Sequence, residues 1–283
     1  MVERQRKRTD GAVALAAAAT GLLLCATGCS GGGTASDDAR TAEDPVEVLH
    51  GAAGNLVRAG TSKARTSMEM ATGGTRVTIR GEGVYDFADQ VGRLKVLLPQ
   101  DPAGAEGHRP ITELLAPGAL YMKNRGAGVP TDKWVRVDTA TLSDGNLVTG
   151  GATDPFAAAE LLRGARRATY MGRTSVAGTA VRHYRGTADL TVAARDASAG
   201  NREALRAALR AAAKGFATAT VPFDVYLDEQ GRIRKVRHRF SFVNGQQKDT
   251  VAVSSTTLLY DFGAAVDVRL PRTKDIFAGR IAE

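Results

Sequence analysis

Alternation of apolar and polar residues runs through most of the chain and predicts β-strands. Residues 221–227 place an apolar side chain at every second position, and residues 236–242 repeat the pattern after a turn at residues 228–231. Asn244-Gly245 marks the next tight turn. The same pattern predicts further strands over residues 67–70, 77–87, 94–98, 119–123, 134–138, 170–175, 180–190, 251–260 and 266–268.

Helix signals occur at three places. Asp44-Pro45 gives a cap followed by a proline suited to the first helical position, and Gly60 ends the apolar stripe that follows. Asp154-Pro155 opens a second helix that closes at Gly164. Residues 201–213 predict a third helix, with leucine and alanine on one face and a ridge of arginines on the other.

These elements predict one α+β domain. About ten strands joined mostly by hairpins, with about three helices, favour an antiparallel sheet over βαβ units. Gly81 and Gly83 fall inside a strand, where glycine indicates a bend or bulge that curves the sheet. We expect the folded domain to span residues 44–283.

The N-terminus has the pattern of an export signal. A basic start is followed by the uncharged, mostly apolar residues 11–24, which are too few to span a bilayer comfortably. The small residues Ala26-Thr27-Gly28 then precede Cys29, which resembles a bacterial lipobox. We expect cleavage between Gly28 and Cys29, lipidation of Cys29, and a flexible tether over residues 29–43. An ordinary secretory signal with an incidental cysteine and an uncleaved anchor are the alternatives.

Composition agrees with an exported protein. The chain has two cysteines, Cys25 and Cys29, so the domain after the signal contains no free thiol and no disulfide. The formal net charge of +8 favours proximity to an anionic membrane surface. We therefore expect a lipid-anchored protein on the extracytoplasmic face of the cell membrane. Nucleic acid is not an expected partner, and the sequence does not identify an export partner.

Catalytic and metal-binding signatures do not emerge from the sequence. The four histidines are scattered without ligand spacing, so neither a metal site nor a cofactor is expected. No G-x-S-x-G, S-x-x-K or H-E-x-x-H motif occurs, and we assign no catalytic residue. The densest positive run, residues 232–239, has two interpretations. Arg237 and Arg239 could contact an anionic headgroup at a cavity mouth, or the run could form the solvated face of a hairpin.

Several local patterns, in this order, resemble the LppX/LprG-type lipoproteins of actinobacteria. They are Thr66-Ser67-Met68, residues 118–123 (GALYMK), residues 133–138 (KWVRVD), residues 221–228 (VPFDVYLD) and residues 260–263 (YDFG). The resemblance covers roughly residues 45–271. It implies a strongly curved antiparallel half-barrel wrapped around helices, similar to the LolA/LolB carriers, with an apolar cavity for acyl chains. Members bind or ferry lipids and lipoglycans at the cell envelope. The lipobox cysteine, Cys29, is the one family residue that carries over.

A lipid cavity and a filled core remain open alternatives at this point. Alanine-rich helices against a curved sheet could leave room for acyl chains or could pack closely. A carrier or chaperone for a lipid or lipoglycan is the leading hypothesis. A structural or sensory lipoprotein with a filled core and a protein partner is the alternative, and an envelope enzyme comes third. The residues expected to line a cavity wall are Met68, Met70, Val84, Leu94, Val96 and Phe240.

Overall fold

The computed structural model describes residues 43–99, 109–126, 128–197, 202–243 and 249–279. The chain divides into two units, Met1–Thr41 and Ala42–Glu283, and the description below concerns the second. The expected signal peptide, the lipidation site and nearly all of the tether lie outside the described residues. No helix within the described ranges is long and apolar enough to cross a membrane.

The second unit is built on one sheet of eleven strands, in the order β6-β5-β4-β3-β2-β1-β11-β10-β9-β8-β7. All neighbouring strands pair antiparallel. The strands are β1 Thr61–Thr72, β2 Thr75–Asp86, β3 Val91–Leu97, β4 Ile111–Ala116, β5 Ala119–Lys123, β6 Val135–Asp138, β7 Ala165–Val176, β8 Thr179–Asp189, β9 Thr220–Leu227, β10 Ile233–Val243 and β11 Thr250–Tyr260.

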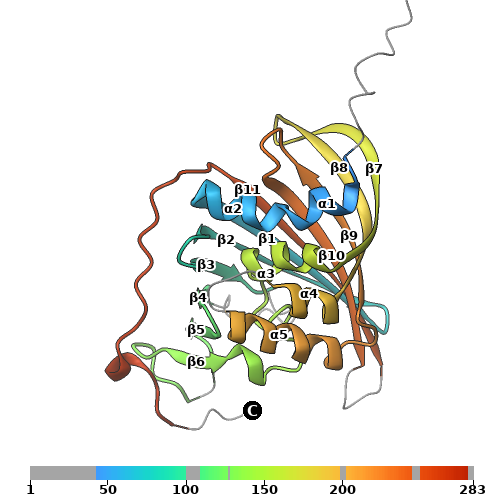
Figure 1. Cartoon of the computed structure of the whole chain (residues 1–283). Helices are drawn as coiled ribbons and strands as arrows, with labels where there is room; N and C mark the ends of the chain where they lie inside the picture. The colour runs from blue at the N-terminus through green and yellow to red at the C-terminus, as the bar shows by residue number, and fades with distance from the viewer. Residues whose placement is uncertain (1–42, 100–108, 127, 198–201, 244–248, 280–283) are drawn as a thin grey trace, which may run out of the picture. The chain divides into compact units, whose positions relative to one another are not determined.

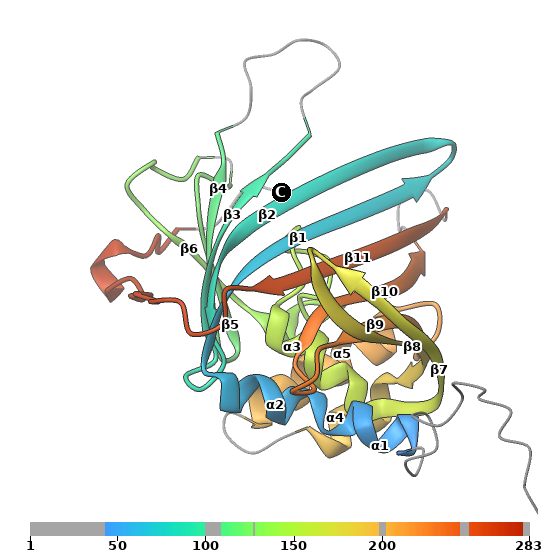
Figure 2. The same ribbon diagram turned by 90° about the horizontal axis from the view of Figure 1, so that it is seen from above.

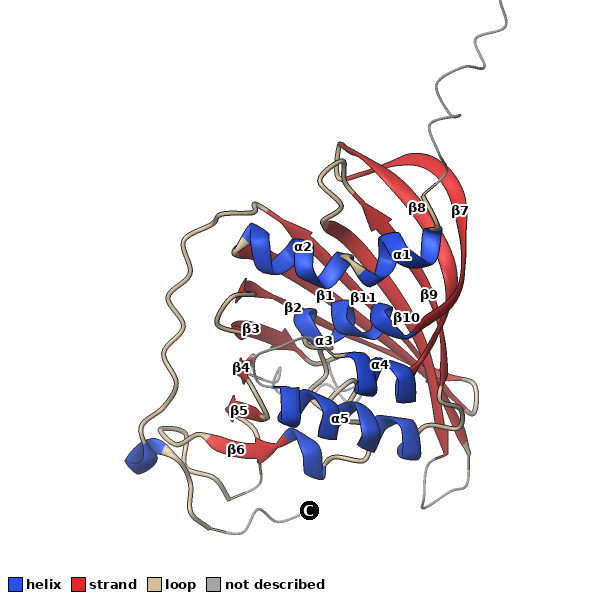
Figure 3. Ribbon diagram, in the orientation of Figure 1, coloured by secondary structure: helices blue, strands red, loops and turns tan. Residues whose placement is uncertain are grey.

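The helices lie on the concave face of this sheet, which curves around them as an open half-barrel (Figures 1 and 2). Figure 3 shows the same division into a layer of helices and a layer of strands. The helices are α1 Pro45–His50, α2 Ala52–Ala59, α3 Pro155–Glu160, α4 Leu190–Asp196 and α5 Arg202–Gly215, with short 3-10 turns at Thr139–Thr141, Leu161–Gly164 and Thr273–Asp275. The predicted fold class, an α+β antiparallel half-barrel, is confirmed.

Aspartates begin the interior helices, as their sequence positions suggest. The carboxylate of Asp44 accepts a hydrogen bond from the Val46 N–H at 2.9 Å and so caps α1. Asp154 caps α3 by accepting from the N–H groups of Phe156 and Ala157 at 2.7 and 3.1 Å. The caps predicted at Asp44 and Asp154 are therefore confirmed.

Four local predictions differ from the structure. The first predicted helix is two helices, α1 and α2, which meet at Gly51. Strand β4 was not predicted, and residues 266–268 are not a strand. Helix α4 follows β8 directly, because Asp189 ends the strand and caps the helix through the N–H groups of Thr191 and Val192 at 2.8 and 3.0 Å.

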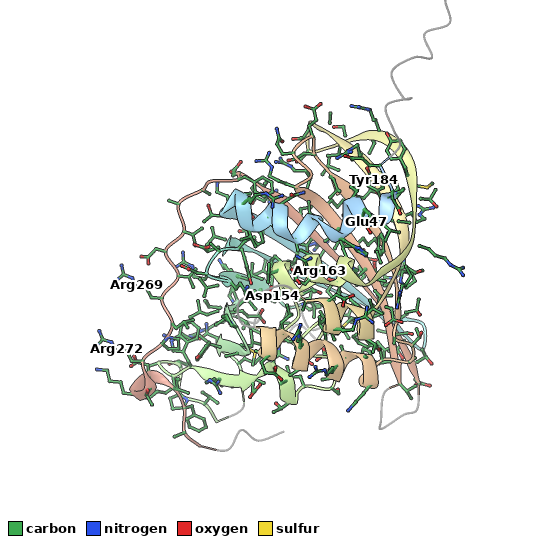
Figure 4. All side chains as sticks on the ribbon, viewed as in Figure 1. Glu47, Asp154, Arg163, Tyr184, Arg269 and Arg272 are labelled. Atoms are coloured by element: carbon green, nitrogen blue, oxygen red, sulfur yellow. The ribbon has the colours of Figure 1, made fainter. Side chains whose placement is uncertain are left out.

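The segment after β11 runs along the outside of the unit to the far edge of the sheet (Figure 1). There the Trp134 N–H donates to the Asp275 carbonyl, and the Phe277 N–H donates to the Trp134 carbonyl, both at 2.8 Å. These bonds make a parallel bridge between Trp134 and Ile276 just before β6. The bridge partly covers an edge that would otherwise expose unpaired backbone groups. Arg269 and Arg272, labelled in Figure 4, project outward from this segment.

Glycines allow close approach between neighbouring strands where the sheet bends. A Cβ on Gly83 in β2 would collide with the carbonyl oxygen of Arg93 in β3, and a Cβ on Gly186 in β8 would collide with that of Arg167 in β7. The register of β2 with β1 and β3 runs through Gly81 and Gly83 without a shift, so no β-bulge occurs at these positions, and Gly83 instead permits the close approach of β3.

Substituting Gly83 by alanine should destabilise the protein by about 3 kcal/mol, because the methyl group meets rigid backbone rather than a flexible side chain. The matched variant Gly54→Ala lies within α2, where the new methyl meets only ordinary contact at 3.6 Å from Arg58. It should stabilise by up to about 1 kcal/mol through helix propensity. Urea unfolding of the two variants measures both effects. A Gly83→Ala variant as stable as the parent would contradict the close approach.

Candidate functional site

Protein side chains fill most of the concave side of the sheet. One apolar cluster joins the inner faces of the strands to α1–α3, and its members include Leu49, Phe87, Leu94 and Phe223. A second cluster, around α4 and α5, contains Met68, Leu209, Phe240 and Val253. Asp154, labelled in Figure 4, lies in this interior and accepts a hydrogen bond from the Tyr85 hydroxyl at 3.3 Å. The concave face is therefore mainly a packed core.

An apolar pocket of about 400 Å³ remains at one end of the half-barrel. It lies where the ends of β1, β3 and β10, the start of β2 and the C-terminus of α5 meet the loop 143–151. This volume falls within the range of about 300–1,000 Å³ that is typical of small-molecule sites. The pocket is lined by Met70, Ile79, Leu98, Arg125, Ser143, Asp144, Val148, Thr149, Gly151, Gly215, Phe216, Phe242 and Val243.

Asp144 shapes the loop that forms one wall of the pocket. Its buried carboxylate accepts hydrogen bonds from the N–H groups of Asn146, Val148 and Thr149 at 3.0, 2.8 and 2.5 Å. Gly145 follows with φ +57°, and a Cβ there would collide with the Ala208 backbone in α5. The loop is thus tied internally and pressed against α5, and the negative charge of Asp144 is engaged by backbone donors.

Arg125 is the single cation among the described residues that line the pocket. It belongs to the connection between β5 and β6 and is partly buried. The structure gives it no hydrogen bond or ion pair with any described residue. The sequence prediction did not include Arg125, because the glycine-rich connection around it has no periodic pattern.

Glu113 is a buried carboxyl group on the concave face, outside the lining of the pocket. The register places it on the inner face of β4, opposite Leu94 of β3 and Met122 of β5. It is fully buried, and neither carboxyl oxygen has a hydrogen-bond partner among the described residues. Burial raises the pKa of Glu113 to about 8, although the charge of Arg125 acts in the opposite direction. The group is therefore mainly protonated at neutral pH.

Glu113 Oε1 and Asn146 Oδ1, two buried oxygens, both lie close to Gly150. The point where a Cβ on Gly150 would lie is 3.0 Å from Asn146 Oδ1 and 3.5 Å from Glu113 Oε1. The Asn146 oxygen is likewise buried without a partner among the described residues. Gly150 thus lets both polar side chains approach the same backbone position, next to Gly151, which lines the pocket.

His238 is a second buried titratable group on the concave face. Burial lowers its pKa to about 3, so the ring is neutral, and its Nε2 has no partner among the described residues. Its neighbour across the ladder is Ser255, whose hydroxyl lies 2.6 Å from that of Thr153. No group of three or more His, Cys, Asp or Glu side chains in the described ranges could hold a metal ion.

The expected cavity-wall residues take three different positions. Met70 lines the pocket. Met68, Leu94, Val96 and Phe240 are buried in the apolar clusters, and Phe240 lies directly behind the pocket because its ring stacks on Phe216 at 4.9 Å.

Val84 is on the opposite face of the sheet from these residues. Its partners in the register are Lys63 of β1 and Arg93 of β3, both exposed on the convex face. Side chains alternate between the faces of a strand, so Tyr85 and Gly83 point inward and Val84 does not. The register therefore removes Val84 from the wall.

Arg237 and Arg239, expected as headgroup contacts at a cavity mouth, lie on the convex face and not in the pocket. Arg237 Nε donates to Ser254 Oγ at 2.7 Å. Arg239 joins His183 and Arg185 around Asp224, with distances of 2.9, 2.9 and 2.8 Å. Partial burial opposes ionisation of Asp224, yet these three hydrogen bonds lower its pKa to about 2. The two arginines therefore take part in side-chain contacts among β8, β9, β10 and β11 on the convex face, and neither lines the pocket.

The fold and the pocket together define an open α+β half-barrel with a small, mostly apolar pocket at one end. No protein-family model matches the chain, and no curated protein matches it. Among solved structures, the chain is similar to the Mycobacterium tuberculosis lipoprotein LppX, at 11% identity and a TM-score of 0.44. That match covers 79% of this chain and 99% of LppX.

Two further solved structures are similar over comparable lengths. LprF from Mycobacterium bovis matches at 12% identity and a TM-score of 0.38, over 80% of this chain and 96% of LprF. A LolA superfamily protein from Nitrosomonas europaea matches at 10% identity and a TM-score of 0.32, over 77% of this chain and 94% of that protein. LppX and LolA were also named by the sequence resemblance. None of these TM-scores reaches 0.5, so the likeness carries no argument about function.

Replacing Glu113 by glutamine should change how stability depends on pH. The folded-state pKa is raised from 4.5 to about 8, so the folded protein binds more protons than the unfolded chain between these values. Parent stability therefore falls as the pH rises from about 4.5 to about 8, at up to about 1.4 kcal/mol per pH unit. The Glu113→Gln variant lacks this loss and should exceed the parent by several kcal/mol at pH 8.

Urea unfolding at acidic, neutral and mildly alkaline pH measures this difference. The control Glu82→Gln alters an exposed carboxylate on the convex face and should follow the parent curve. A stability difference between Glu113→Gln and the parent that stays constant with pH would show that Glu113 is not buried in its neutral form.

Proposed function

We propose that this chain is a lipoprotein of the bacterial cell envelope that binds a lipid or a lipidated glycan, as carrier or chaperone, without covalent chemistry. The observation that carries the proposal is the apolar pocket at the end of the half-barrel. Seven of its lining side chains are aliphatic, methionine or phenylalanine, and its polar lining is confined to the loop and Arg125. An acyl chain matches such a wall because it has no polar group to satisfy.

The mouth of the pocket supports entry of an acyl chain. Val243 lines the pocket and is 54% exposed, so apolar surface continues from the interior to the outside. Each methylene that leaves water contributes about 0.8 kcal/mol. About ten methylenes would therefore contribute about 8 kcal/mol before the cost of association is subtracted. This is enough for reversible binding.

The filled core favours one alternative, a structural or sensory lipoprotein that acts through a protein partner. Four of the six side chains expected to line a large cavity are packed beneath the helices instead. Under this alternative the pocket would bind no lipid, so direct binding separates the two functions.

The envelope location is part of the same proposal. Residues 1–28 would be removed, Cys29 would carry the lipid, and residues 29–43 would tether the domain on the extracytoplasmic face of the membrane. A tether of this length, at about 3.5 Å per residue, reaches about 50 Å at most. The pocket would then work close to the bilayer that holds its ligands.

Filling the pocket should weaken lipid binding. The full chain is titrated with the fluorescent fatty acid cis-parinaric acid, and saturable binding is expected. In Val148→Trp the indole occupies space needed by about two methylenes, so affinity should fall about tenfold. The matched variant Val84→Trp places the same side chain on the convex face and should bind like the parent.

Thermal unfolding of both variants shows whether they are folded, and Val243→Glu, at the exposed mouth, provides a second test that does not depend on core packing. Absence of saturable binding by the folded parent would favour the alternative with a filled core. Equal affinity in Val148→Trp, Val243→Glu and Val84→Trp would place the ligand outside the pocket.

Replacing Cys29 by serine should remove the anchor. The variant should either remain unprocessed or leave the membrane fraction, because the thiol that accepts the lipid is absent. The control Cys25→Ser lies within the segment to be removed and should stay processed and membrane-bound. Separating membrane from soluble fractions measures the attachment of each variant, and mass analysis of the mature N-terminus measures its processing. A processed Cys29→Ser variant that remains on the membrane would overturn the lipobox interpretation.

A further inference from the structure

Arg125 places a positive charge in a pocket wall that is mostly apolar apart from the loop residues Ser143, Asp144 and Thr149. A partly buried guanidinium loses hydration, and this cost is normally offset by an anion or by several acceptors. The structure gives Arg125 neither a hydrogen bond nor an ion pair with any described residue. The planar group presents donors in a fork that fits two oxygens of a carboxylate or a phosphate.

The two acidic side chains closest to this part of the wall do not serve as that anion. Asp144 also lines the pocket, but its carboxylate oxygens already accept hydrogen bonds from three backbone N–H groups. Glu113 does not line the pocket, although it lies within electrostatic range of Arg125. It makes no ion pair with any described residue, and burial favours its protonated form. The guanidinium therefore remains available to a ligand.

The apolar lining and the guanidinium lie in the same cavity. Met70, Phe216 and Phe242 supply surface for hydrocarbon, and Arg125 supplies a donor fork beside it. An anionic amphiphile matches this arrangement, because its hydrocarbon chain can contact the apolar side chains while its charged headgroup contacts Arg125. A wholly apolar lipid would leave the guanidinium without a partner, and a cationic amphiphile would be repelled by it.

We propose that the pocket is selective for lipids with an anionic headgroup, a carboxylate or a phosphate, whose oxygens accept hydrogen bonds from Arg125 while the acyl chain packs against Met70, Phe216 and Phe242. This inference rests on the proposed lipid-binding function and adds the class of headgroup. Arg125 selects the anionic headgroup, and the apolar wall supplies the affinity for the acyl chain.

Calorimetric titration of the full chain with three probes of one chain length tests this selectivity. The probes are dodecanoate, dodecyl phosphate and dodecanol, at neutral pH and below micelle formation. The parent should bind at least one of the two anions at least tenfold more tightly than the alcohol, and the stronger of the two identifies the headgroup. Arg125→Gln should abolish this preference while its affinity for dodecanol stays unchanged, which a merely structural role would not produce.

Two controls accompany this variant. Arg136→Gln makes the same change of charge at an exposed position on β6 outside the pocket and should keep the preference. Arg125→Lys retains the charge without the fork and should keep part of it. An anion preference that persists in Arg125→Gln would overturn the inference. Equal binding of all three probes by the parent would overturn the headgroup selectivity alone, whereas no binding of any probe would overturn the proposed function itself.

Discussion

The concave face of the eleven-stranded sheet is mainly apolar, and the need to cover it determines the arrangement of the helices in the unit. The cover consists of helices whose contact faces are largely alanine, such as Ala158, Ala193 and Ala212. Glycines permit still closer approach, since a Cβ on Gly164 or Gly215 would collide with neighbouring backbone. Small contact residues therefore lead here to close packing, and the pocket at the end of α5 lies at the margin of this packed region.

The same cover buries groups that would otherwise be charged. Glu113 and His238 face the interior from β4 and β10, and burial favours the neutral form of each. Their effects on stability have opposite dependence on pH. His238, with its pKa lowered from 6.5 to about 3, costs stability as the pH falls through this interval. Glu113 costs stability as the pH rises from about 4.5 to about 8. The two intervals overlap between about pH 4.5 and 6.5, where the opposing effects offset each other, so the free energy of unfolding should be greatest there.

Sequence patterns predicted most strands and two of the helix caps, because alternation and capping are local properties. Strand β4 was missed because Leu114 and Leu115 are adjacent and both buried, so its pattern does not alternate. Helix α4 was missed because it begins at Leu190 directly after β8, with Asp189 serving as both the end of the strand and the N-cap. The alternation in β2 already puts Val84 on the opposite face from Tyr85 and Phe87, so its inclusion in the wall was an error that the local pattern could have prevented. The sequence could not place Arg125 in a pocket, because it lies in an irregular connection whose position depends on tertiary packing.

The size of the pocket bears on which ligand the fold can take without rearrangement. At about 400 Å³ it lies near the lower end of small-molecule sites, so it suits one hydrocarbon chain rather than several. Enlarging it inward would require separating α5 from the loop 143–151, where Gly145 and Gly215 bring the two backbones together. That contact resists small displacements because backbone on both sides is rigid. A lipid with several acyl chains would therefore place one chain in the pocket and leave the others outside, beside the exposed apolar rim at Val243.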